Sequence, residues 1–467
     1  MRLAEVSIQN FRSIKNCTVL FNEVTAIIGE NNAGKTALLR ALNSVFNWEF
    51  EAPFFADNTH QYASRTITKI VVTFEDTPIK EVYADKRNGD NLTLAFSYSY
   101  GNTTRRKTLA CKTAEGDVFV DDEFIVELKH DIDYVYIPAS RSNRDLTWAE
   151  NSIFKRVLSA YSKQYNGKRD NISRQVERVA EALKKTVFSK LEGEIGKASM
   201  LNADEQYSLQ YHEIIDYTVF LDKVGLSIQE NGRDFPVSEY GSGIKSLSVI
   251  ALHRVLAQLE NVNVVLGIEE PETNLHPHAQ KKLIASIVNE RQNTEVQAIM
   301  ATHSTVIVDE LRHEDIILAR RIPDIKRGFY TSYTQLDHTF WDKYHLDEYK
   351  HSNFFRYRNS EFFFAKYVII TESITDAQVI QHLVEDGIGQ RKYYVSIINL
   401  DGVKNIKYPY FLLKELGIPF SMVVDHDVIA TYSEGSLDAS RDSETYLEFT
   451  PQPKTPCKCY IFSQSVL

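Results

Sequence analysis

The segment Gly29–Thr36 constrains the fold more than any other part of the sequence. Its sequence is GENNAGKT, and it lies between the apolar run Val24–Ile28 and a helical pattern over residues 37–42. Glycine-rich backbone between a buried strand and a helix presents N–H groups to phosphate oxygens. We therefore predict a P-loop for ATP and Mg²⁺ rather than a glycine turn with a surface lysine. The predicted nucleotide contacts are Gly29, Asn31, Asn32, Gly34, Lys35 and Thr36, and the Thr36 hydroxyl is also a predicted metal ligand.

A P-loop needs an acidic partner after a second buried strand, because the metal and the attacking water must be held beside the phosphates. The apolar segment Val262–Ile268 is followed directly by Glu269 and Glu270. We predict that Glu269 completes the Mg²⁺ shell and that Glu270 is the base that orients water. A further apolar segment, 298–301, precedes His303, which we predict to sense the γ-phosphate; the alternative is a structural histidine.

A serine–glycine pair opens another predicted helix, within the sequence YGSGIKS. The free N–H groups at a helix N-terminus can bind an anion, although an ordinary N-cap would use the same residues. The predicted contacts to a nucleotide phosphate are Ser242, Gly243 and Lys245.

The middle of the chain combines strand patterns with a long helical pattern. Residues 69–74, 92–98 and 118–120 alternate as in an antiparallel sheet, and Arg105 to Lys107 form a basic cluster on a predicted hairpin. That cluster is either a solvated surface or a contact to nucleic acid. The helical stripe fits either intrachain packing or dimerisation. Its members are Val176, Val179, Ala180, Leu183, Val187 and Leu191.

The last hundred residues alternate strand, helix and strand, which predicts a small parallel sheet. Two of its strands end in acids, in the sequences VIITESITD and VVDHD. The carboxyl ends of parallel strands meet at one edge, so these acids are expected to converge. Grouped carboxylates suit Mg²⁺ or Mn²⁺, with Ca²⁺ as an alternative, and such a site can support phosphoryl displacement. The predicted catalytic metal ligands are Glu372, Asp376, Asp425 and Asp427.

Composition limits the classes that remain. The formal net charge of −10 argues against coating nucleic acid by bulk charge, although a local basic groove is compatible with it. The apolar runs are too short to cross a membrane, the N-terminus lacks a signal-peptide pattern, and only 4 cysteines occur. These features predict a cytoplasmic protein and exclude membrane, disulfide-framed and disordered classes.

The predicted fold class is α/β: a P-loop ATPase head with a helical insertion, followed by the small parallel sheet. We place the head in residues 1–145 and 216–338, and the insertion, a candidate dimerisation element, in 146–215. The connector spans 339–366 and is rich in aromatic residues, as expected of a packing seam. The final domain spans 367–467.

The order of motifs adds a family resemblance. P-loop, Ser-Gly loop, Glu-Glu strand and His loop resemble the ABC-type heads of structural-maintenance and recombination ATPases, in which two heads enclose ATP. The later strand-end Glu and Asp-x-Asp resemble the TOPRIM fold. An ABC-type head followed by TOPRIM resembles the OLD (overcoming lysogenization defect) nucleases, across GENNAGKT, YIPASR, YGSGIKS, GIEEPETNLHP, ATHS, EFFFAKYVIITESITD and VVDHD.

The resemblance implies an ATP-dependent, metal-dependent DNA endonuclease that works as a homodimer or higher oligomer. It also implies a role in bacterial anti-phage defence, as in Gabija systems and some retrons, with a helicase or a reverse transcriptase and its DNA as partner. Two alternatives stay open: an ATP-driven sensor whose TOPRIM domain only docks a partner, and a repair-type ATPase. The chain ends 40 residues after Asp427, at Leu467, so the TOPRIM domain is either minimal or shortened.

Overall fold

The chain forms two compact units in the computed structural model, residues 1–139 with 263–467 and residues 140–262. The structure describes the following residues: 1–63, 66–100, 105–139, 152–163, 166–198, 208–211, 221, 224–288, 296–325, 328–346, 360–387, 394–400, 405, 407–425 and 459–463.

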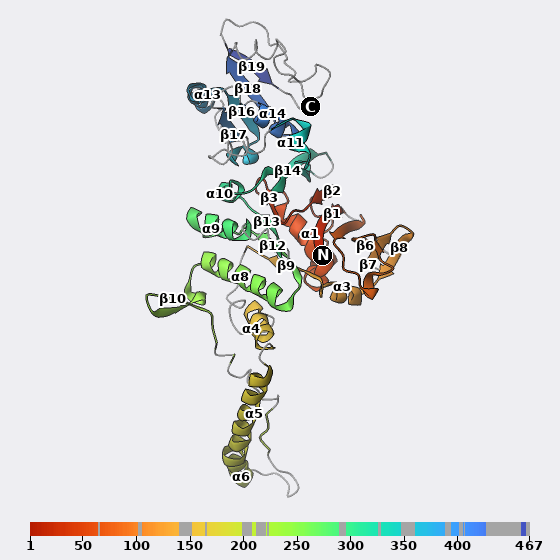
Figure 1. Cartoon of the computed structure of the whole chain (residues 1–467), viewed down its shortest axis with the longest axis vertical. Helices are drawn as coiled ribbons and strands as arrows, with labels where there is room; N and C mark the ends of the chain where they lie inside the picture. Colours follow the sequence, from red (N-terminus) through yellow and green to blue (C-terminus); the bar gives the residue numbers. More distant parts are fainter. Residues whose placement is uncertain are drawn as a thin grey trace. The chain divides into compact units, whose positions relative to one another are not determined.

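The first unit is built on one large mixed sheet (Figure 1), with strand order β8-β7-β6-β4-β1-β2-β15-β14-β3-β13-β12-β9 and with β5 paired to β6. Strands β14, β3, β13, β12 and β9 are parallel, whereas β1, β2, β4 and β6 to β8 are antiparallel. The strands are β1 Arg2–Phe11, β2 Ile14–Leu20, β3 Val24–Ile28, β4 Thr68–Glu75, β5 Arg87–Asn88, β6 Asn91–Tyr100, β7 Arg105–Thr113, β8 Gly116–Val120, β9 Ile132–Ile137, β12 Asn263–Glu269, β13 Val296–Ala301, β14 Ile316–Asp324 and β15 Gly328–Gln335.

The parallel half is buried because its strands are apolar throughout. All five residues of β3 are buried, as are five of the six residues of β13. Helix α1 (Lys35–Phe46) packs across β9, β12 and β13 with a continuous apolar face. The strand-to-helix transition that positions the P-loop therefore rests on the most buried part of the sheet. The helices that follow the parallel strands are α9 Pro277–Val288, α10 Thr305–Val308 and η5 His313–Asp315.

The antiparallel half has the alternating burial that its sequence predicts. Every second residue of β4 is buried, and β4, β6 and β8 extend over the predicted strand patterns. Two short helices were not predicted. Helix α2 (Trp48–Ala56) contributes Phe55 to the core, and α3 (Asp122–Leu128) begins at Asp121, whose carboxylate accepts the Phe124 N–H. A short 3₁₀ helix, η1 Glu81–Tyr83, lies between β4 and β5.

The C-terminal sheet has the order β17-β16-β18-β19. Strands β16 (Tyr367–Thr371), β17 (Val395–Asn399) and β18 (Phe420–Asp425) are parallel, which confirms the predicted α/β class. Strand β19 (Cys459–Ser463) adds an antiparallel edge that was not predicted. The accompanying helices are η6 Ser360–Phe364, α13 Ile374–Gly387 and α14 Lys407–Glu415.

Aromatic rings join α14 to the residues that follow β15. The Trp341 ring, on α11 (Phe340–Lys343), stacks on Tyr408 with centroids 5.3 Å apart, and Tyr344 stacks on Phe411 at 4.1 Å. The His313 ring also stacks on Tyr408 and is hydrogen-bonded to the Tyr408 hydroxyl. These contacts fit the packing role expected of the aromatic connector. Its members Phe354, Phe355 and Tyr357 lie outside the described residues.

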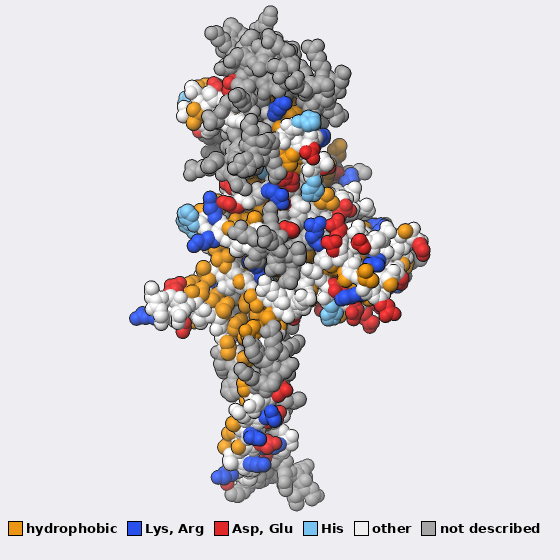
Figure 2. All heavy atoms as spheres, viewed as in Figure 1, with side chains coloured by type: hydrophobic (Ala, Val, Ile, Leu, Met, Phe, Trp, Pro, Cys, Tyr) orange, Lys and Arg blue, Asp and Glu red, His pale blue; other side chains and the backbone are white. Residues whose placement is uncertain are grey.

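The second unit is mainly helical. Its small core contains Ile153 and Val157 from α4 and Leu256 from α8. In the predicted stripe, Val179, Leu183, Val187 and Leu191 are 43–61% exposed within this chain, and Figure 2 shows apolar side chains along this helix. Its elements are α4 Ile153–Lys163, α5 Asn166–Leu183, the π-helix η3 Lys184–Phe188, α6 Ser189–Ala198, the hairpin β10 Ser227–Glu230 and β11 Arg233–Pro236, η4 Val237–Glu239 and α8 Ser242–Glu260.

The strand expected over 216–220 lies outside the described residues. The predicted segment boundaries, including the insertion 146–215, stay predictions. None of the helices in the described ranges combines the length and the apolar character that crossing a lipid bilayer requires.

The packing of Tyr134 against Gly267 gives a stability prediction. A Cβ added to Gly267 would lie 2.0 Å from the Tyr134 hydroxyl oxygen, and that hydroxyl donates to the buried Leu39 carbonyl. Since a crowded core must shift to admit a methyl group, Gly267→Ala is expected to lower the free energy of unfolding by about 2–3 kcal/mol. Chemical denaturation followed by circular dichroism measures this change.

Gly193→Ala is the matched control. Gly193 lies within α6, and nothing lies within 4 Å of an added Cβ. Alanine there is expected to be neutral or to stabilise by up to about 1 kcal/mol. Equal stability of the two variants would contradict the packing argument.

Candidate functional site

The P-loop curls around the N-terminus of α1. Asn32, with φ of 60°, and Gly34, with φ of 105°, adopt left-handed backbone that reverses the chain before Lys35. The Tyr333 hydroxyl donates to the Gly34 carbonyl at 2.8 Å, and a Cβ on Gly34 would lie 2.4 Å from the Thr331 hydroxyl oxygen. Strand β15 therefore packs against Gly34 and holds this part of the loop in place. Asn31 and Asn32 are exposed.

Lys35 is directed onto its own loop. Its Nζ donates to the carbonyl oxygens of Gly29 at 3.0 Å and Glu30 at 2.9 Å, and only 6% of the residue is exposed. Burial lowers the pKa of Lys35 to about 8, although nearby carboxylates, Glu270 first among them, oppose this shift. A phosphate group can therefore compete for this ammonium, whose hydrogen bonds within the described residues go to two neutral carbonyls.

Glu269 and Glu270 lie where β12 ends. The Ala139 N–H donates to the Glu269 carboxylate at 3.4 Å, and the hydroxyl of Tyr136 on β9 is hydrogen-bonded to the same carboxylate. Glu270 has φ of 42°, a costly conformation for a residue with a side chain, and its N–H donates to the Ala301 carbonyl at 2.8 Å. The reversal after β12 therefore turns two consecutive acids in different directions.

His303 follows β13, which lies between β3 and β12 in the sheet. Burial first, and the charge of Lys35 second, lower the pKa of His303, so its imidazole is neutral at neutral pH. The charges of Lys35, Glu270 and Glu272 all act on this ring. The sequence-predicted residues Lys35, Glu270 and His303 are thus brought together at one edge of the sheet.

Glu272 was not predicted as a site residue. Its Oε2 accepts the Thr302 hydroxyl at 2.8 Å, and its Oε1 accepts the His303 N–H at 2.7 Å. Arg12, in the turn between β1 and β2, is a second residue that was not predicted. It belongs beside the site because the charges of Arg40, Glu51 and Glu269 act on it. Spacing could not predict their contacts, because Glu272 bonds to the loop after β13 and Arg12 lies far from Glu269 in the sequence.

The Ser-Gly motif lies in the second unit. Helix α8 begins at Ser242, five residues before the start of the helix predicted over residues 247–259, so the Ser-Gly pair lies in its first turn. Gly243 is buried, and Lys245 lies in the first turns of the helix. The structure does not describe the Ser242 side chain.

The second predicted site lies at the end of the C-terminal sheet. Glu372 follows β16, and Asp425 ends the neighbouring parallel strand β18, so the two positions share a sheet edge. Asp376 instead caps its own helix: its Oδ2 accepts the Ser373 hydroxyl at 2.7 Å and the Ser373 N–H at 3.1 Å. The sequence ESITD therefore contains a capping box, a signal that sequence reasoning can recognise.

Residues with oxygen-bearing side chains occur at two of the predicted metal positions in the first unit. Thr36 and Glu269 have a hydroxyl and a carboxylate beside the P-loop, and Glu372 follows β16 at the sheet edge where β18 ends at position 425. Hydroxyl and carboxylate oxygens are the ligands that Mg²⁺ prefers. Within the described ranges, no three His, Cys, Asp or Glu residues form a group that could hold a metal ion. The Asp425 side chain and all of Asp427 lie outside the described residues.

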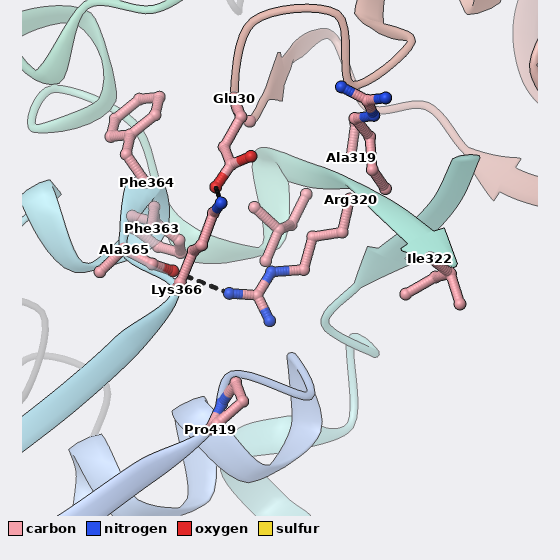
Figure 3. A pocket seen from close by; sticks show the side chains of 12 residues that line it. Glu30, Ala319, Arg320, Ile322, Phe363, Phe364, Ala365, Lys366 and Pro419 are labelled. Atoms are coloured by element: carbon pink, nitrogen blue, oxygen red, sulfur yellow. Dashed lines mark hydrogen bonds and ion pairs between the residues drawn. The ribbon is translucent and has the colours of Figure 1, made fainter. Parts of the chain in front are cut away.

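A cavity of about 370 Å³ separates the P-loop from the C-terminal sheet (Figure 3). At its wall, Arg320 of β14 donates to the carbonyl oxygens of Ala365 at 2.8 Å and Gly417 at 3.0 Å. Lys366 lies 3.8 Å from the Glu30 carboxylate. Since residues 365 and 417 lie just before β16 and β18, Arg320 connects the strand beside the P-loop to the two strands that precede Glu372 and Asp425.

Two protein families match this chain, one over the nucleotide site and one over the C-terminal sheet. A family described as "AAA domain, putative AbiEii toxin, Type IV TA system" matches residues 24–309. A family described as "Overcoming lysogenization defect protein-like, TOPRIM domain" matches residues 363–427. The two matches cover, respectively, the nucleotide-site residues and three parallel strands of the C-terminal sheet.

Relatives align over most of the chain. OLD nuclease of Thermus scotoductus is 24% identical, over 95% of this chain and 84% of its own length. Endonuclease GajA of Bacillus cereus is 22% identical, over 86% and 70% respectively. A solved SMC head bound to the C-winged helix domain of ScpA is 14% identical, with a TM-score of 0.45, over 72% of this chain and 99% of that one.

The Arg320 contacts give a second prediction. Arg320→Ala removes two hydrogen bonds from a charged, half-buried donor, so we expect the free energy of unfolding to fall by about 2–3 kcal/mol. Arg320→Lys is expected to recover only part of this loss, because an ammonium lacks the forked geometry of a guanidinium. Thermal and denaturant unfolding of the full chain measure both changes.

Arg321→Ala is the matched control. The neighbouring Arg321 is exposed, and its guanidinium lies 3.8 Å from the Phe329 ring centroid, a contact that contributes about 1 kcal/mol or less at an exposed site. If Arg320→Ala were no more destabilising than Arg321→Ala, the contacts to Ala365 and Gly417 would not hold the C-terminal sheet in place.

Proposed function

The chain belongs to the family of AAA-domain proteins and also carries an OLD-like TOPRIM domain, and from this premise we propose that it is an ATP-hydrolysing, metal-dependent DNA endonuclease. The observation that carries the proposal is the grouping of Lys35, Glu270 and His303, which interact electrostatically at one sheet edge although Lys35 and His303 are 268 residues apart in the sequence. A structural role for each residue separately would not require that grouping.

Each residue has a role in the proposed ATPase. Lys35 leaves the Gly29 and Glu30 carbonyls to bind the outer phosphates, with the P-loop N–H groups around them. Glu270 accepts a proton from the attacking water, and the neutral His303 ring contacts the γ-phosphate. Thr36 and Glu269 would hold Mg²⁺, which contributes Lewis-acid polarisation when it is bound.

The proposed DNA-cleaving site lies at the carboxyl ends of β16 and β18. Glu372, Asp425 and Asp427 are the proposed ligands for Mg²⁺ or Mn²⁺, with Ca²⁺ as an alternative. Asp376 is proposed to act through the capping box, which orders the start of α13 beside Glu372. The relatives are a nuclease and an endonuclease, and their names support cleavage as the reaction.

Assembly and biological role are further parts of the proposal. We propose a homodimer or higher oligomer in which Ser242, Gly243 and Lys245 of one copy contact ATP bound to the other. The exposed apolar stripe on α5, η3 and α6 supports a dimerisation role for the insertion. Anti-phage defence, with a helicase or a reverse transcriptase and its DNA as partner, is the proposed setting.

A second candidate function is an ATP-driven sensor that docks a partner without cutting DNA. The observation that favours it is the Asp376 carboxylate, since its use as a helix cap leaves fewer acids for metal binding. DNA cleavage assays separate the two functions.

The ATPase assignment predicts the behaviour of Glu270→Gln. Because a general base contributes about 10²–10⁴-fold, turnover should fall at least 100-fold, while affinity for a fluorescent ATP analogue should stay within about twofold. Phosphate release and fluorescence titration measure these quantities. Glu49→Gln makes the same change at an exposed position on α2 and should hydrolyse ATP like the unmodified protein. Normal turnover in Glu270→Gln would refute the base assignment.

The nuclease assignment predicts the behaviour of Asp425→Ala. Supercoiled and linear DNA are incubated with Mg²⁺ or Mn²⁺, with and without ATP, and with a chelator as the metal-free control. The unmodified protein should cut only with metal, and Asp425→Ala should lose cleavage while it retains ATP hydrolysis. Glu385→Ala, an exposed acid on α13, is the matched control and should cut normally. Cleavage that persists in Asp425→Ala would exclude the TOPRIM assignment, and no cleavage by the unmodified protein would favour the sensor.

A further inference from the structure

Glu272 joins two loops that are separate in the sequence. It lies in the loop after β12, and both of its carboxylate oxygens accept bonds from the loop after β13, about thirty residues later. One bond comes from the Thr302 hydroxyl at 2.8 Å and the other from the His303 N–H at 2.7 Å. Bonds to an ionised carboxylate are about twice as strong as neutral ones, so this carboxylate fixes the backbone at His303.

The rest of the His303 loop is also held. Thr302 is fully buried, and its hydroxyl oxygen accepts the Ser304 N–H at 3.0 Å. The Ser304 hydroxyl in turn donates to the Gln280 side chain at 2.6 Å, and the Thr302 N–H donates to the Ile27 carbonyl. The residues on both sides of His303 are therefore hydrogen-bonded, and among these described partners of the loop Glu272 is the charged one.

Glu272 reaches the loop because the preceding turn is unusual. The left-handed conformation of Glu270 reverses the chain immediately after β12, and the Thr273 N–H donates to the Glu270 carbonyl at 3.1 Å. The same turn therefore sets the direction of Glu270 and places Glu272 against the His303 loop. A displacement of about 1 Å at such a site can cost on the order of 100-fold in rate.

We propose that Glu272 is a positioning residue for the ATPase: it holds His303 at the γ-phosphate position and does not itself contact the nucleotide. This inference rests on the proposed function. It adds Glu272 as a residue that affects hydrolysis only through His303. It separates the three acids of the sequence EEPE into a metal ligand, a base and a support for the histidine. The effect of Glu272 on hydrolysis should then exist only while His303 is present.

A double-mutant cycle tests this dependence. Glu272→Ala is expected to lower the turnover number about 10- to 100-fold, with affinity for a fluorescent ATP analogue within about twofold of the unmodified protein. In a His303→Ala background, the same Glu272→Ala change should lower turnover by less than about twofold. A merely structural role would instead give the same fold-loss in both backgrounds, and that result would overturn the proposal.

Variants of Thr302 keep the test informative if Glu272→Ala fails to fold. Thr302→Val removes one of the two donors to Glu272 and should lower turnover, again only when His303 is present. Thr302→Ser keeps the hydroxyl and should restore turnover to near the unmodified value. Equal turnover in Thr302→Val, Thr302→Ser and the unmodified protein would contradict positioning through this carboxylate.

The outcome distinguishes this inference from the function on which it rests. If the unmodified protein hydrolyses ATP and Glu270→Gln does not, the proposed ATPase stands, and normal turnover in Glu272→Ala overturns the positioning role alone. If the unmodified protein does not hydrolyse ATP at all, both are overturned. Thermal unfolding of every variant shows whether a lost activity reflects lost folding.

Discussion

The parallel pairing of β14, β3, β13 and β12 is the constraint on which the nucleotide site depends. Parallel strands have their carboxyl ends at one edge, and here those ends carry the P-loop after β3, Glu269 and Glu270 after β12, and His303 after β13. Both faces of these strands are buried, so the fit of large side chains against small ones must set their register. Close fits such as Gly267 against Tyr134 maintain that register. The chemical groups are polar, but apolar packing determines where they meet.

The same sheet also links the nucleotide site to the C-terminal sheet. A Cβ on Gly29 would lie 2.1 Å from the Ala319 carbonyl oxygen, so the first residue of the P-loop packs directly on β14. The next residue of β14, Arg320, is bonded to the segments that lead into β16 and β18. Lys35 is bonded to the Gly29 and Glu30 carbonyls, and phosphate binding would release it from them. A short series of contacts therefore leads from the P-loop to the strands β16 and β18.

Local sequence signals predicted the α/β class, the strand–loop–helix at Gly29–Thr36, the strand before Glu269 and the parallel C-terminal strands, because each depends on neighbouring residues. The matches to the two families confirm the predicted resemblance and the enzyme class. Contacts between residues far apart in the sequence were beyond such reasoning: Glu272 meets His303, and Arg320 meets Gly417, across 31 and 97 residues of sequence. Asp376 shows a local signal that the sequence already contained, since ESITD has the pattern of a capping box and Asp376 is hydrogen-bonded to Ser373. Its predicted convergence with the other acids stays a prediction. The residue assignments at both sites stay predictions until the variants are measured.

Charge balance at the P-loop bears on what the site can bind. Glu30, Glu270 and Glu272 all act on the buried Lys35, so three carboxylates face one ammonium whose pKa burial has lowered to about 8. ATP would add several more negative charges to this edge. Such an arrangement binds a nucleotide only if further cations approach it. A divalent ion on Thr36 and Glu269 is one source, Arg12 is a second, and Lys245 of another copy is the third in the proposed dimer. The net charge of −10 is therefore a poor guide to binding, because part of it lies in acids whose proposed role requires bound cations.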